Sequence, residues 1–247
     1  NMIGGYLSPE GNYSSHQIDT ASQYTYGDKS YTFGSAPTEM ARSDLIVYFG
    51  NNPANTRMSG GSDTYHYQWY KKQNSARTIV IDPQYTDTAC GREDLWLAIR
   101  PGSDAALVEA IAWVLITEGF TDDDFLKTHC YGYDEEPGDS EKNIPPLDKR
   151  LGYKAYILGE GIDGIAKTPK YASAICGIPE EQIYQLAREL GHAKAPYIAQ
   201  GWGPQRQAAG EQTARAIFML PILLGKIGLP GTNNGASDFL FHTTDVM

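Results

Sequence analysis

The sequence predicts an α/β fold, arranged as a three-layer αβα sandwich around a mostly parallel sheet. Buried, strand-like runs alternate with helical patterns along the chain, which is typical of such sandwiches. Three hydrophobic runs, at 45–49, 78–81 and 197–199, each end in a polar turn rich in Gly, Asn, Asp or Pro. In an open parallel sheet such ends line one crevice, where α/β proteins bind nucleotides. We therefore expect this chain to hold a large phosphate-bearing cofactor.

The first 81 residues contain two of the expected strands. Residues 1–40 are rich in Gly, Ser, Tyr and Thr with weak periodicity, so we expect them to wrap the domain outside the sheet, with a short helix beginning at 35–39. The run at 45–49 has the length of a strand, and 64–72 has helical spacing. The β-branched residues at 78–81 indicate a second buried strand.

A third short run, 97–99, leads into the helix that the sequence defines best. Ser103 is a candidate N-cap, and Asp104 favours the positive end of a helix. An apolar face at helical spacing follows, formed by Leu107, Ala110, Ile111, Val114 and Leu115. A shorter helix is expected at 121–128, because Thr121 precedes three aspartates.

The second half begins with an irregular segment. From 131 to 167 the composition turns to Gly, Pro, Asp, Glu and Lys, which indicates a surface excursion, with a small hairpin expected at 153–158. Pro169 and Pro179 each stand near the first turn of a further helix. A last helix is expected from 210 to 224, after the final strand.

Composition narrows the class of protein. The 247 residues, 41% of them hydrophobic, suit a single α/β domain spanning 1–247, expected to be excised from a longer chain. The net charge of −10 argues against a nucleic-acid or anionic-membrane surface, since both need a basic face. Cys90, Cys130 and Cys176 lack ligand spacing, so they predict neither a zinc site nor a four-cysteine iron–sulfur cluster. No apolar stretch approaches the ~20 residues of a membrane span.

The first polar turn offers amides, a hydroxyl and a guanidinium beside backbone that a ligand can approach. Gly50-Asn51-Asn52-Pro53 is followed by Thr56 and Arg57, and the arginine could clamp a phosphate with two hydrogen bonds. The alternative is a well-bonded turn with Asn in left-handed conformations. The glycine pattern of nicotinamide and flavin folds is absent after this strand.

The second turn and the following helix each carry a carboxylate. Asp82 stands at a strand end, where a ribose-binding carboxylate is expected, with Thr86 nearby. A buried aspartate capping a turn is the alternative. Asp104 could accept the paired N–H donors of a guanine, because a carboxylate presents two acceptors in one plane. A favourable charge at a helix N-terminus explains Asp104 equally well.

The third turn, 200–207, places an indole, two glycines and an arginine between polar amides. A flat ring beside flexible backbone suits a heteroaromatic ligand, although Trp202 could simply pack in the core. No nucleophile, general acid or general base stands out, and the five histidines are not at metal-ligand spacing. No catalytic residue and no metal ligand is therefore predicted within this chain.

Four strings carry a resemblance to a known family: YFGNNPANTRMSGG from Tyr48, IVIDPQYTDTACGRED from Ile79, IRPGSDAALVEAIAWVL from Ile99 and IAQGWGPQRQAAGEQTARAIFMLPILLGKIGLPG from Ile198. Together they resemble the molybdopterin oxidoreductases of the dimethyl sulfoxide reductase family, and the likeness covers nearly the whole chain. The resemblance implies a Rossmann-like domain of the formate dehydrogenase/dimethyl sulfoxide reductase fold. It also implies that this chain binds one molybdopterin guanine dinucleotide and is inactive alone.

In such enzymes, molybdenum is held by two molybdopterin guanine dinucleotides, and the metal ligand and an iron–sulfur cluster lie upstream of the matched segment. The resemblance implies reduction of dimethyl sulfoxide or related S- or N-oxides in anaerobic respiration. It implies an iron–sulfur electron-transfer subunit and a membrane anchor subunit as partners. It further implies export by the twin-arginine route to the periplasmic face of the membrane.

Carried over position by position, the family's cofactor contacts fall on four segments of this sequence. The first loop matches at Gly50, Asn51, Asn52, Pro53, Thr56 and Arg57; the second matches at Ile81, Asp82, Pro83, Gln84 and Thr86; the guanine-binding turn matches at Gly102 and Asp104; and the segment near the pterin matches at Trp202, Gln205 and Arg206. Gln84 and Ser103 depart from the family's pattern, which has Arg and Thr there.

Two alternatives remain at the level of sequence. One is another reductase of the same family, acting on selenate, tetrathionate or nitrate, because residues outside this segment select the substrate. The other is a non-catalytic carbohydrate-binding module, which the 17 Tyr and 4 Trp of an acidic chain would also suit.

Overall fold

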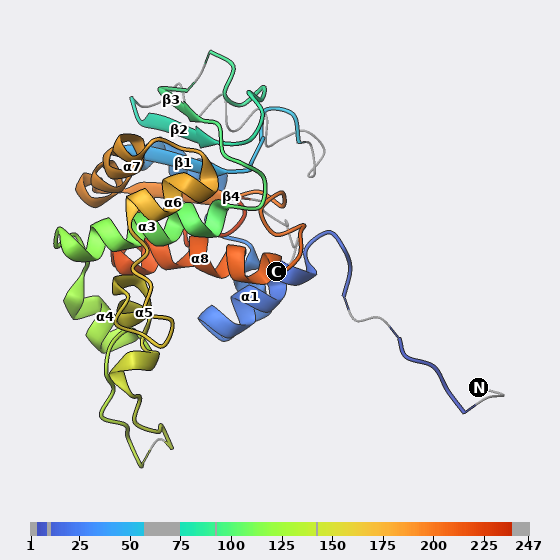
Figure 1. The fold of residues 1–247 in the computed structure, drawn as a ribbon. Coiled ribbons are helices and arrows are strands. Elements are labelled where there is room, and N and C mark those ends of the chain that lie inside the picture. The colour runs from blue at the N-terminus through green and yellow to red at the C-terminus, as the bar shows by residue number, and fades with distance from the viewer. Residues whose placement is uncertain (1–3, 9–10, 57–74, 92, 142, 239–247) are drawn as a thin grey trace.

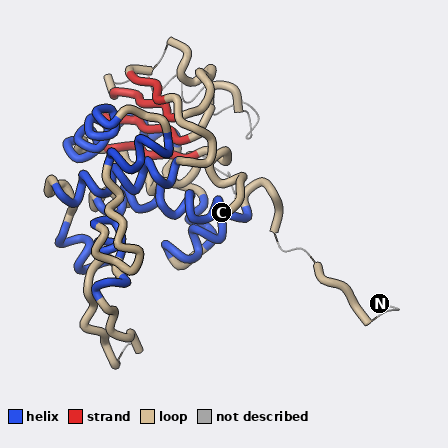
Figure 2. The backbone as a smooth tube through the Cα atoms, in the orientation of Figure 1, coloured by secondary structure: helices blue, strands red, loops and turns tan. Residues whose placement is uncertain are grey.

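The computed structural model describes residues 4–8, 11–56, 75–91, 93–141 and 143–238. Its centre is a four-stranded sheet in the order β3-β2-β1-β4, and every pair of neighbouring strands is parallel. The strands are β1 (Leu45–Phe49), β2 (Arg77–Ile81), β3 (Leu95–Leu97) and β4 (Pro196–Gln200). The predicted α/β class and parallel sheet are confirmed (Figures 1 and 2).

The sheet register brings the three polar turns together at one edge. Phe49, the last residue of β1, lies opposite Ile81 on one side and Gln200 on the other, so three strands end level. The ladder continues one residue further, since Gly50 N donates to Ile81 O at 2.8 Å and Gly201 N donates to Phe49 O at 2.9 Å. The first residues of the turns are therefore held by sheet hydrogen bonds.

Helices cover one face of this sheet (Figure 2). The longer helices are α1 (His16–Tyr26), α3 (Asp104–Thr117), α7 (Glu180–His192) and α8 (Gly210–Leu223), and the shorter ones are α4 (Asp123–His129), α5 (Tyr153–Leu158) and α6 (Pro169–Cys176). α3 lies at the centre of this layer, in contact with α6, α7 and α8. The main core forms between these helices and the alternate strand residues Leu45, Val47, Phe49, Ile79, Ile81 and Ile198.

The opposite face of the sheet carries a smaller apolar cluster. Ile46, Tyr48, Val80 and Tyr197 point to this side and pack against Met40 of the 3₁₀ helix η2 (Pro37–Arg42). Two further 3₁₀ helices, η1 (Lys29–Thr32) and η3 (Lys149–Leu151), lie outside the sheet.

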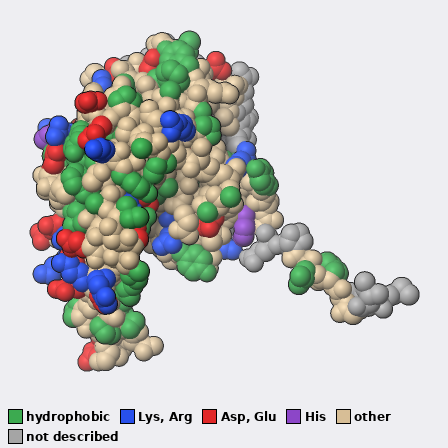
Figure 3. All heavy atoms as spheres, viewed as in Figure 1, with side chains coloured by type: hydrophobic (Ala, Val, Ile, Leu, Met, Phe, Trp, Pro, Cys, Tyr) green, Lys and Arg blue, Asp and Glu red, His purple; other side chains and the backbone are tan. Residues whose placement is uncertain are grey.

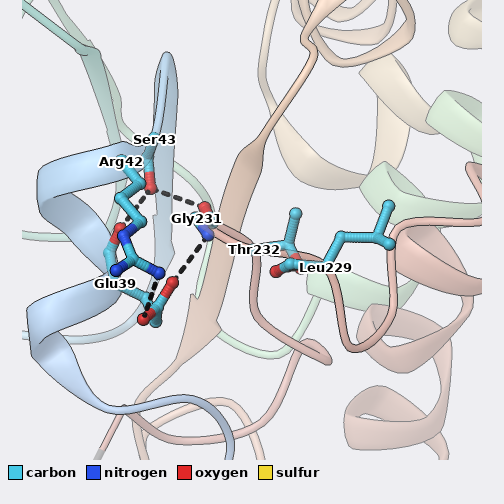
Figure 4. A network of polar contacts seen from close by, with 6 residues as sticks. All are labelled: Glu39, Arg42, Ser43, Leu229, Gly231 and Thr232. Atoms are coloured by element: carbon cyan, nitrogen blue, oxygen red, sulfur yellow. Dashed lines mark hydrogen bonds and ion pairs between the residues drawn. The ribbon is translucent and has the colours of Figure 1, made fainter.

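A polar network joins η2 to the segment after α8 (Figure 4). Gly231 N donates to a Glu39 carboxylate oxygen at 2.8 Å, and Ser43 Oγ donates to Gly231 O at 2.6 Å. Gly231 has a φ of +80°, and a Cβ there would lie 2.7 Å from Arg42 O. Further along, the buried Asn233 donates to Ile198 O at 2.9 Å. These bonds lay residues 231–238 along the free edge of β4.

Several sequence predictions of individual elements match the structure, and others are wrong. Pro169 occupies the first turn of α6, as predicted, with Thr168 capping the Tyr171 amide at 3.2 Å. The third strand begins two residues earlier than expected, at Leu95. Ser103 precedes α3, but its hydroxyl donates to Arg100 O and caps no helical amide. The helix predicted at 64–72 lies outside the described residues.

The hairpin predicted at 153–158 is wrong, because this segment is α5. Ala155 and Ile157 are buried, and the left-handed Gly159, with φ +78°, ends the helix. The antiparallel bridges lie earlier, between Glu136 and Leu147 and between Asp139 and Ile144. The prolines within 137–146 indicated an irregular segment. In the structure, the two bridges instead pair the beginning of this segment with its end.

The opening segment contains a helix that the sequence analysis did not predict. Helix α1 packs Ile18 and Ala21 against Phe218 of α8, although most of its other residues are polar. Its apolar residues are too few to give a clear periodic pattern, so the helix depends on packing rather than on its own sequence. Among the described residues, no helix is long and apolar enough to cross a bilayer.

We expect Leu107→Ala to lower the free energy of unfolding by about 2–5 kcal/mol, because Leu107 is fully buried in the main core and truncation leaves a cavity. Ile162→Ala is the matched control, since Ile162 is 81% exposed and its truncation should change stability by less than about 0.5 kcal/mol. Urea unfolding followed by circular dichroism measures both. Equal losses would contradict the assigned core.

Candidate functional site

The site lies where the strand order reverses. From β1 the chain proceeds to β2 and β3 on one side, and then crosses through the helical layer to β4 on the other side of β1. Open α/β sheets bind ligands in the crevice at the strand ends where the strand order reverses in this way. A cavity of about 190 Å³ occupies this place, lined by Gly50, Asn51, Asn52, Pro53, Thr56, Gly201, Trp202, Gly203, Arg206, Ser237 and Asp238.

Backbone contact between the first and third turns shapes this cavity. A Cβ on Gly201 would lie 2.1 Å from Gly50 O, and a Cβ on Gly50 would lie 2.6 Å from Pro204 Cδ. Gly50 also has a φ of +51°, in the left-handed region that favours glycine. Only glycine allows the two turns to approach this closely, and both glycines line the cavity.

The second turn is attached to the first by Thr88. Its hydroxyl donates to Asn52 Oδ1 at 2.6 Å, and its amide donates to the same oxygen at 3.1 Å. Asp82, directly after β2, accepts the Gln84 amide at 2.9 Å. Burial raises the pKa of Asp82, so its carboxylate is poorly solvated at this edge of the sheet.

Asp104 is a buried carboxylate at the N-terminus of α3. It is 5% exposed, and burial raises its pKa to about 6, with a further contribution from the negative charge of Asp82. Within the described ranges, no other residue donates a hydrogen bond to it. The turn before it is held close to the third turn, because a Cβ on Gly102 would lie 2.7 Å from Gln207 Oε1. A desolvated carboxylate of this kind favours a ligand with N–H donors.

Trp202 and Arg206 form the outer part of the third turn. The guanidinium carbon of Arg206 lies 5.1 Å from the centre of the indole ring, and Arg206 Nε donates to Ser14 O at 3.1 Å. The indole nitrogen of Trp202 is buried and has no hydrogen-bond partner among the residues that the structure describes. An unpaired buried donor is costly, so this N–H is available to an acceptor on a ligand.

Gln205 faces the protein interior instead of the cavity. It is 1% exposed, its Oε1 accepts the Ile18 amide at 3.2 Å, and its Nε2 donates to Ser14 O at 2.6 Å. These bonds fasten the start of α1 to the third turn. The amide that the sequence suggested as a ligand contact is thus already engaged within the chain.

The sequence analysis missed two residues of the cavity wall, Ser237 and Asp238. Asp238 Oδ1 accepts a hydrogen bond from Asn51 Nδ2 at 3.0 Å, and both side chains are largely buried. Their place depends on residues 231–238 lying along β4, which no local pattern indicates. The turn-forming string Thr232-Asn233-Asn234-Gly235 is the one feature that could have drawn attention to this segment.

The structure brings the predicted residues together at one edge of the sheet, in two groups. Those lining the cavity are Gly50, Asn51, Asn52, Pro53, Thr56, Trp202 and Arg206. Those around it, on neighbouring strand ends and turns, are Ile81, Asp82, Pro83, Gln84, Thr86, Gly102, Asp104 and Gln205. Arg57 lies outside the described residues. Among the residues described, no group of three His, Cys, Asp or Glu could hold a metal ion.

Comparison with known proteins gives a consistent assignment. The family model described as molybdopterin oxidoreductase matches residues 1–246. The chain is 52% identical to dimethyl sulfoxide reductase DmsA of Escherichia coli (strain K12), with 96% of this chain and 28% of that protein covered. It is 32% identical to a trimethylamine-N-oxide reductase of Haemophilus influenzae, with 96% and 27% covered. It thus spans less than a third of these relatives.

A solved structure supports the fold. Acetylene hydratase from Pelobacter acetylenicus superposes with a TM-score of 0.63 over 90% of this chain and 25% of the hydratase, at 18% sequence identity. At this identity the likeness concerns the fold alone.

We expect Gly201→Ala to destabilise the chain by about 1–3 kcal/mol, because the added methyl group overlaps a backbone oxygen that cannot move without displacing β1. Gly203→Ala is the matched control in the same turn, since its Cβ would lie 3.5 Å from Gly50 O, an ordinary contact. Thermal unfolding compares the two. A Gly201→Ala variant as stable as the control would contradict the close approach of the turns.

The raised pKa of Asp104 predicts a pH-dependent stability. An unfolded aspartate titrates near 3.9, so between about pH 4 and pH 6 the folded chain without ligand binds the proton more tightly. Stability from this group is therefore complete below about pH 4 and is lost as the pH rises to about 6. Asp104→Asn removes this titration, and its stability relative to the parent should grow by roughly 2–3 kcal/mol across that range. Urea unfolding of the parent and of Asp104→Asn from pH 4 to pH 8 measures this difference in stability. If Asp104 were solvated, the difference would not change with pH.

Proposed function

Because this chain belongs to the molybdopterin oxidoreductase family, we propose that it is the domain that binds one molybdopterin guanine dinucleotide in a reductase of S- or N-oxides. The domain spans 1–247 and is one part of a longer protein. The observation that carries the proposal is the buried carboxylate of Asp104, to which no other described residue donates, at the same edge of the sheet as the cavity at the switch point. A guanine presents two N–H donors in one plane, which matches that carboxylate.

The residues of the site fit such a cofactor in extended form. The cavity of about 190 Å³ is smaller than the usual range for a complete ligand, so it suits one section of a dinucleotide. The remaining section would extend past Asp82 towards Asp104. Gly50, Gly201 and Gly203 leave part of the wall without Cβ atoms, which lets backbone approach a pyrophosphate there. The unpaired indole N–H of Trp202 and the Arg206 guanidinium add donors for anionic or pterin oxygens.

The chain's own contribution is binding and orientation. Asp104 would accept the guanine donors, Asp82 would accept a ribose hydroxyl, and Arg206 would neutralise negative charge at the cavity mouth. Asn51, fixed by Asp238, would orient an amide towards the cofactor. The molybdenum-bound cofactor, when present, supplies the two-electron chemistry at the metal.

The substrate class follows from the relatives, whose names give dimethyl sulfoxide and trimethylamine N-oxide. We extend these to this protein as acceptors in anaerobic respiration, with electrons delivered through an iron–sulfur cluster upstream and an iron–sulfur partner subunit. A membrane anchor subunit, a periplasmic location and twin-arginine export belong to the same proposal. Selenate, tetrathionate and nitrate remain alternative substrates within the family. A carbohydrate-binding module is not supported, because the family match covers nearly the whole chain.

Asp104→Asn in the full-length reductase tests the guanine contact. Replacing one acceptor oxygen by a donor should weaken cofactor retention by about 10- to 100-fold, because hydrogen bonds to a charged group are worth roughly 1.5–3 kcal/mol. Purified protein would be analysed for molybdenum and for GMP released on acid treatment, with both expected to fall together. Asp124→Asn, at an exposed carboxylate in the first turn of α4, is the matched control. Full molybdenum and GMP content in both variants would refute the assigned role.

A further inference from the structure

A second and larger cavity lies on the helical side of the molecule. Its volume is about 800 Å³, within the range of small-molecule sites, and its walls come from α1, α3, α4, α5 and α8 with the loop around Tyr131. It shares no lining residue with the cavity at the switch point. The proposed cofactor site therefore does not account for it.

Phenol rings form much of the wall, and the protein itself satisfies most of their hydroxyls. Tyr26 donates to Asn234 O at 2.6 Å, Tyr131 donates to Pro145 O at 2.8 Å, and Tyr156 donates to Glu109 Oε1 at 2.8 Å. These bonds hold the hydroxyl ends in place and leave the rings to contact an occupant. Walls of fixed aromatic rings favour a flat, apolar body.

Two hydroxyls on this wall are exceptions. The oxygens of Tyr153 and Thr25 are buried and have no hydrogen-bond partner among the described residues. Burial raises the pKa of the Tyr153 phenol well above its ordinary value, so it is a protonated donor at neutral pH. Buried unpaired hydroxyls are uncommon because each forfeits a hydrogen bond to water. Neither oxygen is reached by solvent, so both lie behind the cavity wall and are not available to a ligand in the cavity.

Charge in the cavity favours an anion over a cation. The exposed Arg215 lines the cavity, and no described residue forms an ion pair or hydrogen bond with it. Glu109 is the carboxylate on the wall, but it already accepts the Tyr156 hydroxyl, and burial raises its pKa. A cationic ligand would therefore meet a free guanidinium and a carboxylate with reduced tendency to ionise.

We propose that this cavity is a second ligand site, which binds a planar aromatic molecule carrying a carboxylate or sulfonate group. The ring system packs among the tyrosines, and the anionic group pairs with Arg215. The site is separate from the cofactor turns and does not depend on their assignment.

Naphthalene-2-sulfonate, titrated into the full-length protein by calorimetry, tests the site. Neutral 2-naphthalenemethanol and cationic 2-naphthylmethylammonium have similar ring bodies and isolate the contribution of charge. We expect the sulfonate to bind at one site and most tightly of the three. Arg215→Gln should weaken the sulfonate about two- to fivefold and leave the neutral alcohol unchanged, as for an exposed ion pair. Arg42→Gln makes the same change on the opposite face of the sheet and should have no effect.

Tyr153→Phe is a control within the wall, because its hydroxyl oxygen lies out of reach of the cavity. Its removal should leave sulfonate binding unchanged, and the melting temperature should stay the same or rise because no internal bond is lost. Sulfonate binding weakened severalfold in this variant would mean that the wall is arranged differently and would overturn the proposal. Three other results would also overturn the proposal. The cation could bind most tightly, the sulfonate affinity could be unchanged in Arg215→Gln, or no ligand could bind because water or another part of the protein fills the cavity.

Discussion

The contact between the backbones of Gly201 and Gly50 is the constraint on which the site depends. β1 and β4 are neighbours in the sheet, yet their outgoing turns belong to segments about 150 residues apart in sequence. A Cβ at position 201 would lie 2.1 Å from Gly50 O, so the two turns can meet only where side chains are absent. That contact places Asn51 and Trp202 in the walls of one cavity. The glycines also leave backbone exposed in part of the wall, which suits close approach to a pyrophosphate.

Polar groups that lack hydrogen-bond partners from other described residues lie on the turns and strand ends near this contact. Asp104 is a nearly buried carboxylate with a pKa raised to about 6, and the buried indole N–H of Trp202 has no partner among the described residues. Each arrangement is unfavourable in the free chain, and each becomes favourable when a ligand supplies the missing donor or acceptor. The same residues therefore lower stability and provide binding, as is common at functional sites.

Local sequence predicts a helix or strand when the residues of that element show a clear hydrophobic pattern by themselves. The strand at 45–49 is recognised as a continuous apolar run of strand length, and all five residues are buried. The helix beginning at Asp104 is recognised from apolar residues at helical spacing. The segment at 153–158 was misjudged as a hairpin, since it has only six residues and its buried residues Ala155 and Ile157 are spaced two apart, as on a strand. α1 was missed because its few apolar residues are buried only when Phe218 packs against them.

The sequence by itself determined the α/β class, the strand ends and the carboxylate and amide side chains that follow them, because these are encoded by residues adjacent in the chain. Tertiary structure decided which of these side chains face a ligand. Gln205 points inward because Ser14 and Ile18 bind its amide, and Asp238 joins the site because Glu39 and Asn233 hold its segment along β4. Such partners lie up to about 190 residues away, and their meeting depends on how the whole chain packs.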